Sequence, residues 1–192
     1  MIVDYSSRSV AIKLVFFGPA MSGKTTSIKW LFSTFGSQDK LMSIDNSMGR
    51  TMLCDFGTLE IPLGNTWSMN VNIWTATGQE FYSSTREVVL VGTDGVVFVA
   101  DSQSELLEDN LSSWNELMAL LSEARDWVPI VVCLNKADLP SSVSEFTLRN
   151  HLGIPERVPV LRTVAKDGTN VVEAVDLLLQ RALQEAVAPR CQ

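Results

Sequence analysis

A stretch of eight residues with glycine at two positions, Gly18-Pro-Ala-Met-Ser-Gly-Lys-Thr25, constrains the fold of this chain more than any other feature. It follows a continuous apolar run of strand length, Val10–Phe17, and precedes Thr25–Phe35, where apolar residues recur at helical spacing. Glycines at its first and sixth positions let the backbone curl, so that successive N–H groups face one point and form a nest for phosphate oxygens. The pattern therefore predicts a strand, a phosphate-binding loop and a helix in direct succession.

Strand-like and helix-like segments alternate along the rest of the chain. The expected strands are Thr58–Leu63, Trp67–Trp74, Gly95–Ala100, Val128–Leu134 and Val158–Thr163, and the expected helices are Glu105–Ala124, Val143–Leu152 and Thr169–Val187. The first two strands are joined around Gly64-Asn65, and so short a connection favours an antiparallel pair. The alternation predicts an α/β fold with a mainly parallel central sheet, one antiparallel strand and helices on both faces. With no linker or repeat in the chain, we expect a single domain over residues 1–192.

The phosphate-binding loop supplies the first group of candidate site residues. They are Gly18, Met21, Ser22, Gly23, Lys24, Thr25 and Thr26. In this motif the lysine ammonium reaches the β- and γ-phosphates, where it stabilises the transferring phosphoryl group, and the following hydroxyl binds Mg²⁺. Lys24 is therefore also a candidate catalytic residue. Because ligands of open α/β sheets bind outside the carboxyl ends of the strands, other site residues should follow other strands.

A second motif, Asn135-Lys136-Ala137-Asp138, follows the expected strand Val128–Leu134. A carboxylate at Asp138 can accept hydrogen bonds from N1–H and the 2-amino group of guanine, whereas adenine offers neither donor and would leave it unpaired. The stem of Lys136 can cover one face of the base. Thr163-Val164-Ala165-Lys166 ends another strand, where the Ala165 N–H can face guanine O6 and the Lys166 stem the other side of the base. Together these segments predict a guanine nucleotide, GTP or GDP, as the ligand.

A third motif, Trp74-Thr-Ala-Thr-Gly-Gln-Glu80, ends the strand Trp67–Trp74. The Gly78 N–H is placed to bind a γ-phosphate oxygen, and Gln79 to orient an attacking water molecule. Gln79 can instead be an exposed polar residue near a helix start. The aromatic residues that follow, Phe81 and Tyr82, fit either simple packing or a contact surface that depends on the nucleotide.

Composition and charge exclude several classes of protein. A net charge of −7 leaves no basic patch for nucleic acid, so we expect no nucleic-acid partner. The three cysteines, Cys54, Cys133 and Cys191, are too widely spaced for a disulfide framework or a zinc site. No apolar stretch reaches membrane-spanning length, and neither end carries a recognisable lipidation signal. We therefore expect a cytoplasmic protein with no transmembrane segment and no recognisable lipid anchor.

The motifs, in this order, resemble those of the Ras-like small GTPases, and details are similar to the prokaryotic MglA-like branch. That branch has Thr where other Ras-like proteins have Asp three residues before the switch glycine, and here the residue is Thr75. It also has an Arg-Thr pair followed by Asp-Phe in the first switch, here Arg50-Thr51 and Asp55-Phe56. The branch also shares the sequence of the segment Val96–Ser102 and the spacing from Lys13 to Gly18-Pro19. Ala165-Lys166 is a departure, since it is more similar to the general Ras pattern.

The resemblance implies further roles. Thr51 would supply a second hydroxyl to Mg²⁺ and contact the γ-phosphate, and Arg50 would be an intrinsic arginine finger, a cation that acts on the transferring phosphoryl group. Arg50 can also be a solvated loop residue. Thr75 offers a neutral hydroxyl where a carboxylate normally holds a Mg²⁺-bound water. Either Mg²⁺ binds more weakly, or Asp55 replaces the missing carboxylate, which is the alternative we favour.

The function that these features predict is a GTP-hydrolysing molecular switch with Mg²⁺ as cofactor. Two loops, about Asp39–Asp55 and Thr75–Arg86, would be ordered by GTP and released by slow hydrolysis. Effector proteins would bind one state, and a GTPase-activating protein, by resemblance a roadblock-domain protein, would raise the rate. The resemblance also points to regulation of cell polarity or motility. A GTP-gated scaffold with negligible hydrolysis is the main alternative. A P-loop kinase would need a substrate lid and added arginines, which the sequence does not show.

Overall fold

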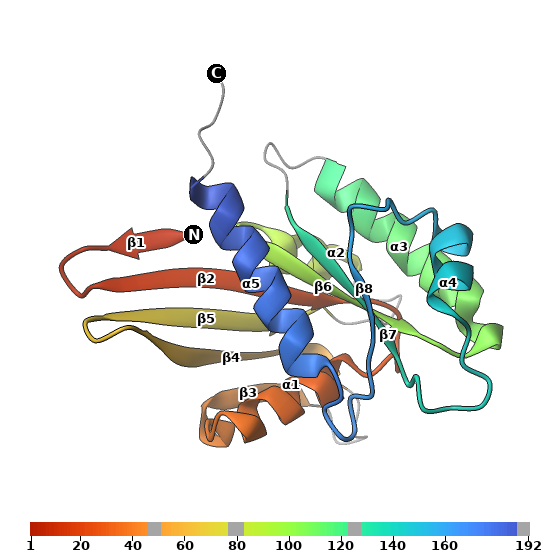
Figure 1. Ribbon diagram of the computed structural model, residues 1–192, viewed down its shortest axis with the longest axis horizontal. Coiled ribbons are helices and arrows are strands. Elements are labelled where there is room, and N and C mark those ends of the chain that lie inside the picture. Colours follow the sequence, from red (N-terminus) through yellow and green to blue (C-terminus); the bar gives the residue numbers. More distant parts are fainter. Residues whose placement is uncertain (46–50, 77–82, 123–127, 188–192) are drawn as a thin grey trace.

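The computed structural model describes residues 1–45, 51–76, 83–122 and 128–187 of the chain. Its centre is a mixed sheet in which the strands lie in the order β3-β4-β5-β2-β6-β7-β8, with β1 paired to β2 beside this path (Figure 1). The strands are β1 (Ile2–Asp4), β2 (Ser9–Phe17), β3 (Leu41–Asp45), β4 (Thr51–Leu63), β5 (Trp67–Thr75), β6 (Gly95–Asp101), β7 (Ile130–Asn135) and β8 (Val160–Arg162). The expected α/β class is confirmed.

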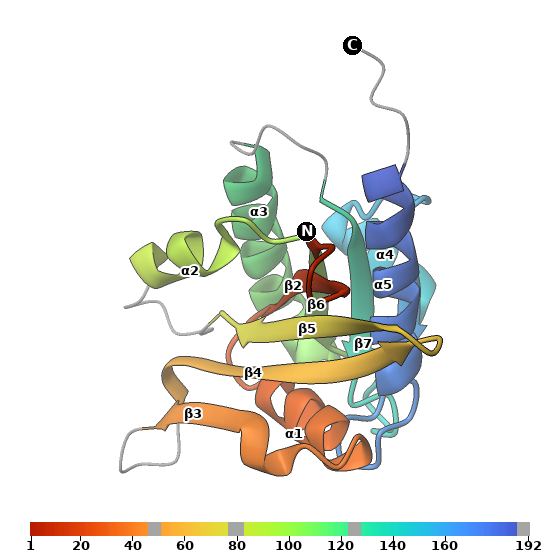
Figure 2. The same cartoon turned by 90° about the vertical axis from the view of Figure 1, so that its left-hand side faces the viewer.

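Helices cover both faces of the sheet. They are α1 (Lys24–Thr34), α2 (Ser83–Leu90), α3 (Leu107–Ser122), α4 (Glu145–Leu152) and α5 (Val171–Val187), with short 3₁₀ turns η1 (Gln38–Lys40) and η3 (Ser104–Leu106). In Figure 2, α2 and α3 lie above the hairpin of β4 and β5, and α1 lies below it. Helices on two faces bury a sheet completely, which explains why every residue of β6 and β7 is buried.

Two apolar cores follow from this arrangement. One lies between α1, α5 and the sheet, and the other between α2, α3, α4 and the opposite face. Alternation along β2 assigns Leu14 and Phe16 to the first core and Val15 and Phe17 to the second. Cys133 belongs to the first core, where burial raises the pKa of its thiol to about 12.

The pairing of the strands confirms the expected connections. β2 is parallel to both β5 and β6, β6 to β7, and β7 to β8, while β4 and β5 form the antiparallel hairpin expected around Gly64. Two further antiparallel pairs, β1 with β2 and β3 with β4, were not expected from the sequence. The segment expected as a loop, Asp39–Asp55, therefore contains strand at both ends. Its middle, residues 46–50, lies outside the described part of the chain.

Parallel strands bring the predicted motifs to one edge of the sheet. β2 ends one residue before Gly18, β5 ends at Thr75, β7 ends at Asn135, and β8 ends one residue before Thr163. Thr75 is paired with Phe16, and Asn135 with Asp101, so these strands end at nearly the same level. The candidate site is built on this edge.

Candidate nucleotide-binding site

Two glycines of the phosphate-binding loop are required by close contacts. Gly18 has a φ of 138°, and a Cβ there would lie 2.2 Å from the carbonyl oxygen of Val99 in β6. Gly23 has a φ of 105°, caps the start of α1, and would place a Cβ 2.1 Å from Nδ2 of Asn135. Side chains at either position would push the loop away from the sheet, so the two glycines set its closeness to β6 and β7.

Lys24 is held inside this loop. Its Nζ donates hydrogen bonds to the carbonyl oxygens of Gly18 at 2.8 Å and Pro19 at 2.7 Å, and the residue is buried. The pKa of its ammonium is lowered to about 7, mainly by burial and also by the nearby charge of Arg86, while Asp55 opposes both effects. A buried ammonium whose hydrogen bonds in the described residues go to neutral carbonyls is suited to bind an anion.

Two of the three residues expected at the metal site, Thr25 and Asp55, lie together. The Thr25 hydroxyl donates to Oδ2 of Asp55 at 2.7 Å, and Asp55 is fully buried. The backbone N–H of Asp55 donates to Oγ1 of Thr75 at 2.6 Å. The hydroxyl of Thr75 thus supports the strand segment that carries Asp55, and the Asp55 carboxylate lies on the hydroxyl that the motif assigns to Mg²⁺.

Asn135 joins the phosphate-binding loop to the second loop of the site. Its Nδ2 donates to the carbonyl oxygen of Ser22 at 2.7 Å, while its Oδ1 accepts from the backbone N–H of Ala165 at 2.9 Å and from the Thr163 hydroxyl at 3.2 Å. The Ala165 N–H, expected to face guanine O6, is therefore bonded to Asn135 here. The buried Ser22 Oγ has no hydrogen-bond partner among the described residues.

Asp138 and Lys166 face each other at the expected base-binding position. They form an ion pair that lowers the pKa of the Asp138 carboxyl, mainly through the hydrogen bond from Lys166, and raises the pKa of Lys166. Asp138 is therefore a charged acceptor, as a contact to guanine N1–H requires. Val164 is buried and closes this loop through backbone bonds with Gly168 and Thr169.

Several other predicted site residues are exposed or lie outside the described part of the chain. Met21 has a φ of 62° and is 79% exposed, and Thr26 is exposed on α1. Arg50, Gly78, Gln79, Phe81 and Tyr82 lie outside the described residues, and so does the side chain of Thr51 at the start of β4. Their proposed roles remain predictions.

Arg86 was not expected among the site residues. It is buried in α2, its Nε lies 2.8 Å from Oε1 of Glu116 in α3, and its charge acts on Lys24. The sequence gives no signal for this placement, because the pairing with Glu116 joins residues of two different helices. The charge of Arg86 adds to the positive potential around the phosphate-binding loop.

Comparisons with known proteins show the family of this chain. A family model described as Ras of Complex, Roc, domain of DAPkinase matches residues 13–138. The mutual gliding-motility protein MglA of Myxococcus xanthus (strain DK1622) is 34% identical over 191 residues, which cover 95% of this chain and 96% of MglA. The Ras-related protein Rab7 of Pisum sativum is 29% identical over 186 residues, covering 93% of this chain and 85% of Rab7. This chain belongs to the Ras-like small GTPases.

The resemblance drawn from the motifs, including its MglA-like character, is thus confirmed. Membership in this small GTPase family implies a GTP-binding switch, and the matched span runs from Lys13 in β2 to Asp138. None of the helices in the described residues is both long and apolar enough to cross a bilayer.

The donor set of this small GTPase fits Mg²⁺. Mg²⁺ prefers oxygen ligands and is commonly bound by one or two protein groups together with phosphate oxygens and water. The Thr25 hydroxyl and the Asp55 carboxylate are such groups, 2.7 Å apart. No cluster of three or more His, Cys, Asp or Glu occurs among the described residues.

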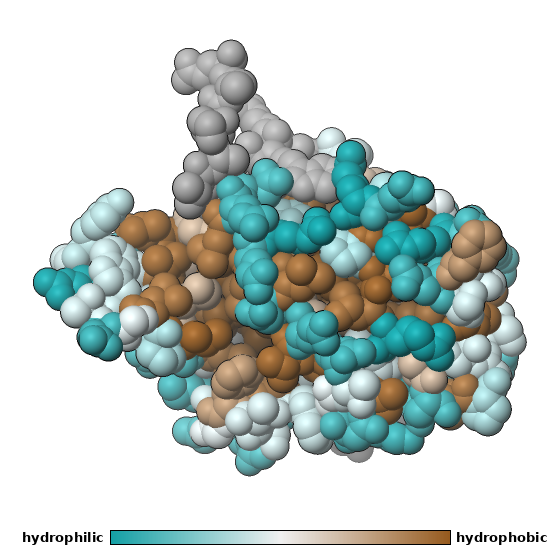
Figure 3. Space-filling view, viewed as in Figure 1, coloured by the Kyte–Doolittle hydropathy of each residue, from teal (hydrophilic) through white to brown (hydrophobic). Residues whose placement is uncertain are grey.

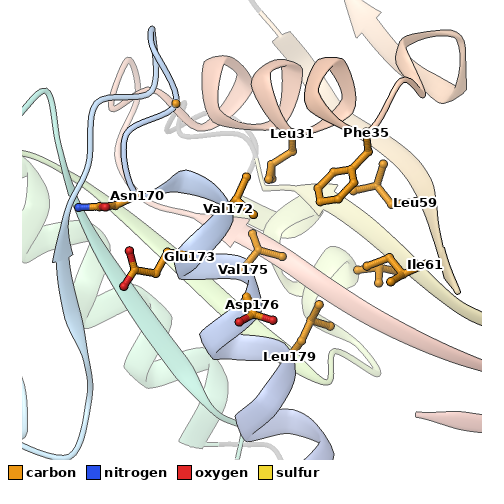
Figure 4. A pocket seen from close by; sticks show the side chains of 12 residues that line it. Leu31, Phe35, Leu59, Ile61, Asn170, Val172, Glu173, Val175, Asp176 and Leu179 are labelled. Carbon is orange, nitrogen blue, oxygen red and sulfur yellow. The ribbon is translucent and has the colours of Figure 1, made fainter. Parts of the chain in front are cut away.

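The GTPase also has an apolar hollow of about 630 Å³ between α1, α5 and the hairpin of β4 and β5. Figure 4 shows its side chains converging from these elements, and Figure 3 shows apolar surface beside the hydrophilic ridge of α5. Lys24 and Asp138 do not line the hollow, whereas Gly168 and Asn170, just beyond the base-binding loop, do. It is therefore separate from the candidate nucleotide site.

Proposed function

We propose that this protein is a molecular switch that binds GTP and GDP with Mg²⁺ and slowly hydrolyses GTP to GDP and phosphate. The observation that carries the proposal is the pair of hydrogen bonds made by the side chain of Asn135, which donates to the carbonyl oxygen of Ser22 and accepts from the N–H of Ala165. It holds the phosphate-binding loop and the base-binding loop side by side, as a single nucleotide that spans both would require. Asp138, charged and at the edge of this site, selects guanine over adenine.

Binding is divided among the chain's own residues. Lys24 and the N–H groups of the phosphate-binding loop hold the β- and γ-phosphates, and Gly78 adds an N–H to the γ-phosphate. Lys136 and Lys166 flank the base. Thr25, Thr51 and Asp55 hold Mg²⁺, which neutralises charge that develops on the phosphates. The contact of Asp55 with Thr25 supports its role as the carboxylate missing at Thr75.

Hydrolysis depends on residues that position water and charge. Gln79 orients the attacking water, and Arg50 approaches the γ-phosphate from the first switch as an intrinsic finger. Turnover without an activator is on the order of 10⁻⁴–10⁻² s⁻¹ in enzymes of this type. Slow turnover makes the protein a timer, because the output is the partner that binds while GTP persists.

Partners follow from this switching role. Effectors bind the GTP state, and a GTPase-activating protein, which the MglA-like character suggests is a roadblock-domain protein, positions Arg50 or Gln79. The printed name of the relative MglA refers to gliding motility, and we extend this to a role in cell polarity or motility in the cytoplasm. The alternative function is a GTP-gated scaffold with negligible hydrolysis, favoured by the neutral hydroxyl at Thr75.

Single-turnover hydrolysis tests these functions. Nucleotide-free protein is mixed with GTP and Mg²⁺, with ATP in parallel and with two variants, Gln79→Leu and Asp55→Asn. We expect slow conversion of GTP alone, slower conversion by Gln79→Leu at unchanged affinity, and about tenfold more Mg²⁺ for half-maximal rate in Asp55→Asn. Bound but unconverted GTP would favour the scaffold. Faster turnover of ATP than of GTP would contradict both functions.

A further inference from the structure

The carboxylate of Asp101 is buried at the edge of the candidate site, and none of the roles proposed above uses it. Asp101 ends β6, is 1% exposed, and pairs in the sheet with Asn135, the first residue of the guanine-binding motif. A buried carboxylate is costly unless it is paired and hydrogen-bonded. Its partners therefore indicate what it does.

Both oxygens of Asp101 are engaged. Oδ2 lies 2.5 Å from Nζ of Lys136, and Oδ1 accepts from the backbone N–H and the side-chain Nε2 of Gln103, each at 3.1 Å. The buried Asn110 of α3 fixes the backbone of Asp101, since it accepts from its N–H at 2.9 Å and donates to its carbonyl oxygen at 2.8 Å. The carboxylate thus has a fixed position when it meets Lys136.

The backbone of Lys136 is fixed as well. Its φ is 62°, and its carbonyl oxygen accepts from the Ser102 hydroxyl at 2.9 Å and from the Leu139 N–H at 3.0 Å. With backbone and ammonium both held, the four-carbon stem between them has fewer rotamers open to it. The other lysine of the base site, Lys166, is 69% exposed, and its partner Asp138 is itself partly exposed. The two lysines are therefore held to different degrees.

We propose that Asp101 is a positioning residue that holds the ammonium of Lys136 and thereby fixes the lysine stem as one wall of the guanine pocket. This inference rests on the proposed function. A free lysine loses rotamer freedom when a base packs on its stem, whereas a stem already ordered by Asp101 loses little. This smaller loss of rotamer freedom appears as slower release of the nucleotide. Asp101 takes no direct part in hydrolysis.

Release of a fluorescent GDP analogue, displaced by excess GDP in Mg²⁺ buffer, tests the proposal. Asp101→Asn keeps the shape of the side chain but not its charge, and Lys136→Met keeps the stem but not the ammonium. We expect about tenfold faster release from each, and release from the double variant no faster than from Lys136→Met alone. Asp109→Asn, an exposed neighbour on α3 with the same loss of charge, should release at the wild-type rate.

A purely structural role would give a different pattern. Asp101→Asn would then speed release in the Lys136→Met background as much as in the wild type, which would overturn the proposal. Release at the wild-type rate from Lys136→Met would also overturn it, even if Asp101→Asn failed to fold. If wild-type protein showed no saturable GDP binding, the proposed function would fail together with this inference. Single-turnover hydrolysis of bound GTP should stay within about twofold of wild type in Asp101→Asn.

Discussion

Lys24 shows how burial prepares a single residue for its ligand. Its ammonium donates to two backbone carbonyl oxygens, and its pKa falls to about 7 because burial disfavours the charged form and Arg86 adds a like charge. A phosphate group next to Nζ would favour the charged form and raise this pKa again. Nucleotide binding and protonation of Lys24 are therefore linked.

The linkage gives a pH dependence with a defined sign. Below pH 7 Lys24 is charged before and after binding, so affinity for GDP should be highest and flat. Above pH 7 the free protein loses the proton while the complex keeps it, so affinity should fall by up to tenfold per pH unit until the pKa of the complex is reached. Calorimetry at pH 8 in two buffers of different ionisation enthalpy should show uptake of up to one proton.

Lys24→Arg is the matched control, because a guanidinium stays charged throughout this range. Where this variant retains GDP binding, proton uptake should disappear. Equal wild-type affinity at pH 6.5 and pH 8.5, with no proton uptake, would contradict the linkage.

Individual site residues differ in how far the sequence predicts them. Lys24, Thr25 and Asp138 stand in motifs of fixed spacing, so their types and places could be predicted before the fold was seen. Asp101 and Arg86 could not, because their roles depend on pairs between separate elements, with Lys136 and Glu116. Asn135 was assigned to nucleotide binding, whereas the structure shows it joining two loops.

At the scale of elements, Gly57 sets how closely β4 lies against α1. A Cβ there would lie 2.5 Å from Cζ of Phe32 and 2.8 Å from the carbonyl oxygen of Lys40. Gly57→Ala should therefore lower the free energy of unfolding by about 1–3 kcal/mol through overpacking. Urea unfolding measures this loss. Because β4 also carries Asp55, the same change should raise the Mg²⁺ needed for GTP hydrolysis.

A compensating variant separates overpacking from other causes. Phe32→Leu removes the ring atoms that the new methyl group would meet, so Phe32→Leu/Gly57→Ala should be more stable than the sum of the two single losses predicts. An interaction of at least about 0.5 kcal/mol is expected for residues in contact. Additive losses would show that Phe32 is not the obstacle.

The elements that were not expected from the sequence share a physical cause. β1 has three residues and is exposed, and β3 lies at the edge of the sheet, so neither carries the long apolar run that marks a buried strand. Both owe their conformation to pairing with β2 and β4. The buried strands β6 and β7 were predicted because helices on both faces demand apolar side chains throughout.

At the scale of the whole molecule, the candidate site joins parts of the fold that are distant in sequence. The phosphate-binding loop follows β2, while the base-binding residues follow β7 and β8, on the far side of β6. In the protein alone, Asn135 links these loops. A bound guanine nucleotide would add a second link, so it should stabilise the folded molecule as a whole.

This gives a prediction that separates phosphate binding from base recognition. At 100 times its dissociation constant, GDP with Mg²⁺ should stabilise the protein by about 2.7 kcal/mol, which raises Tm by about 5–10 °C in a chain of this length. ADP at the same concentration should give a much smaller shift, because Asp138 would lose its partners. In Asp138→Asn the Tm shift with GDP should shrink. A xanthine nucleotide, whose 2-oxo group accepts from the new amide, should then give the larger Tm shift. Equal shifts with GDP and ADP would mean that the phosphates alone bind, and that the loop carrying Asp138 does not read the base.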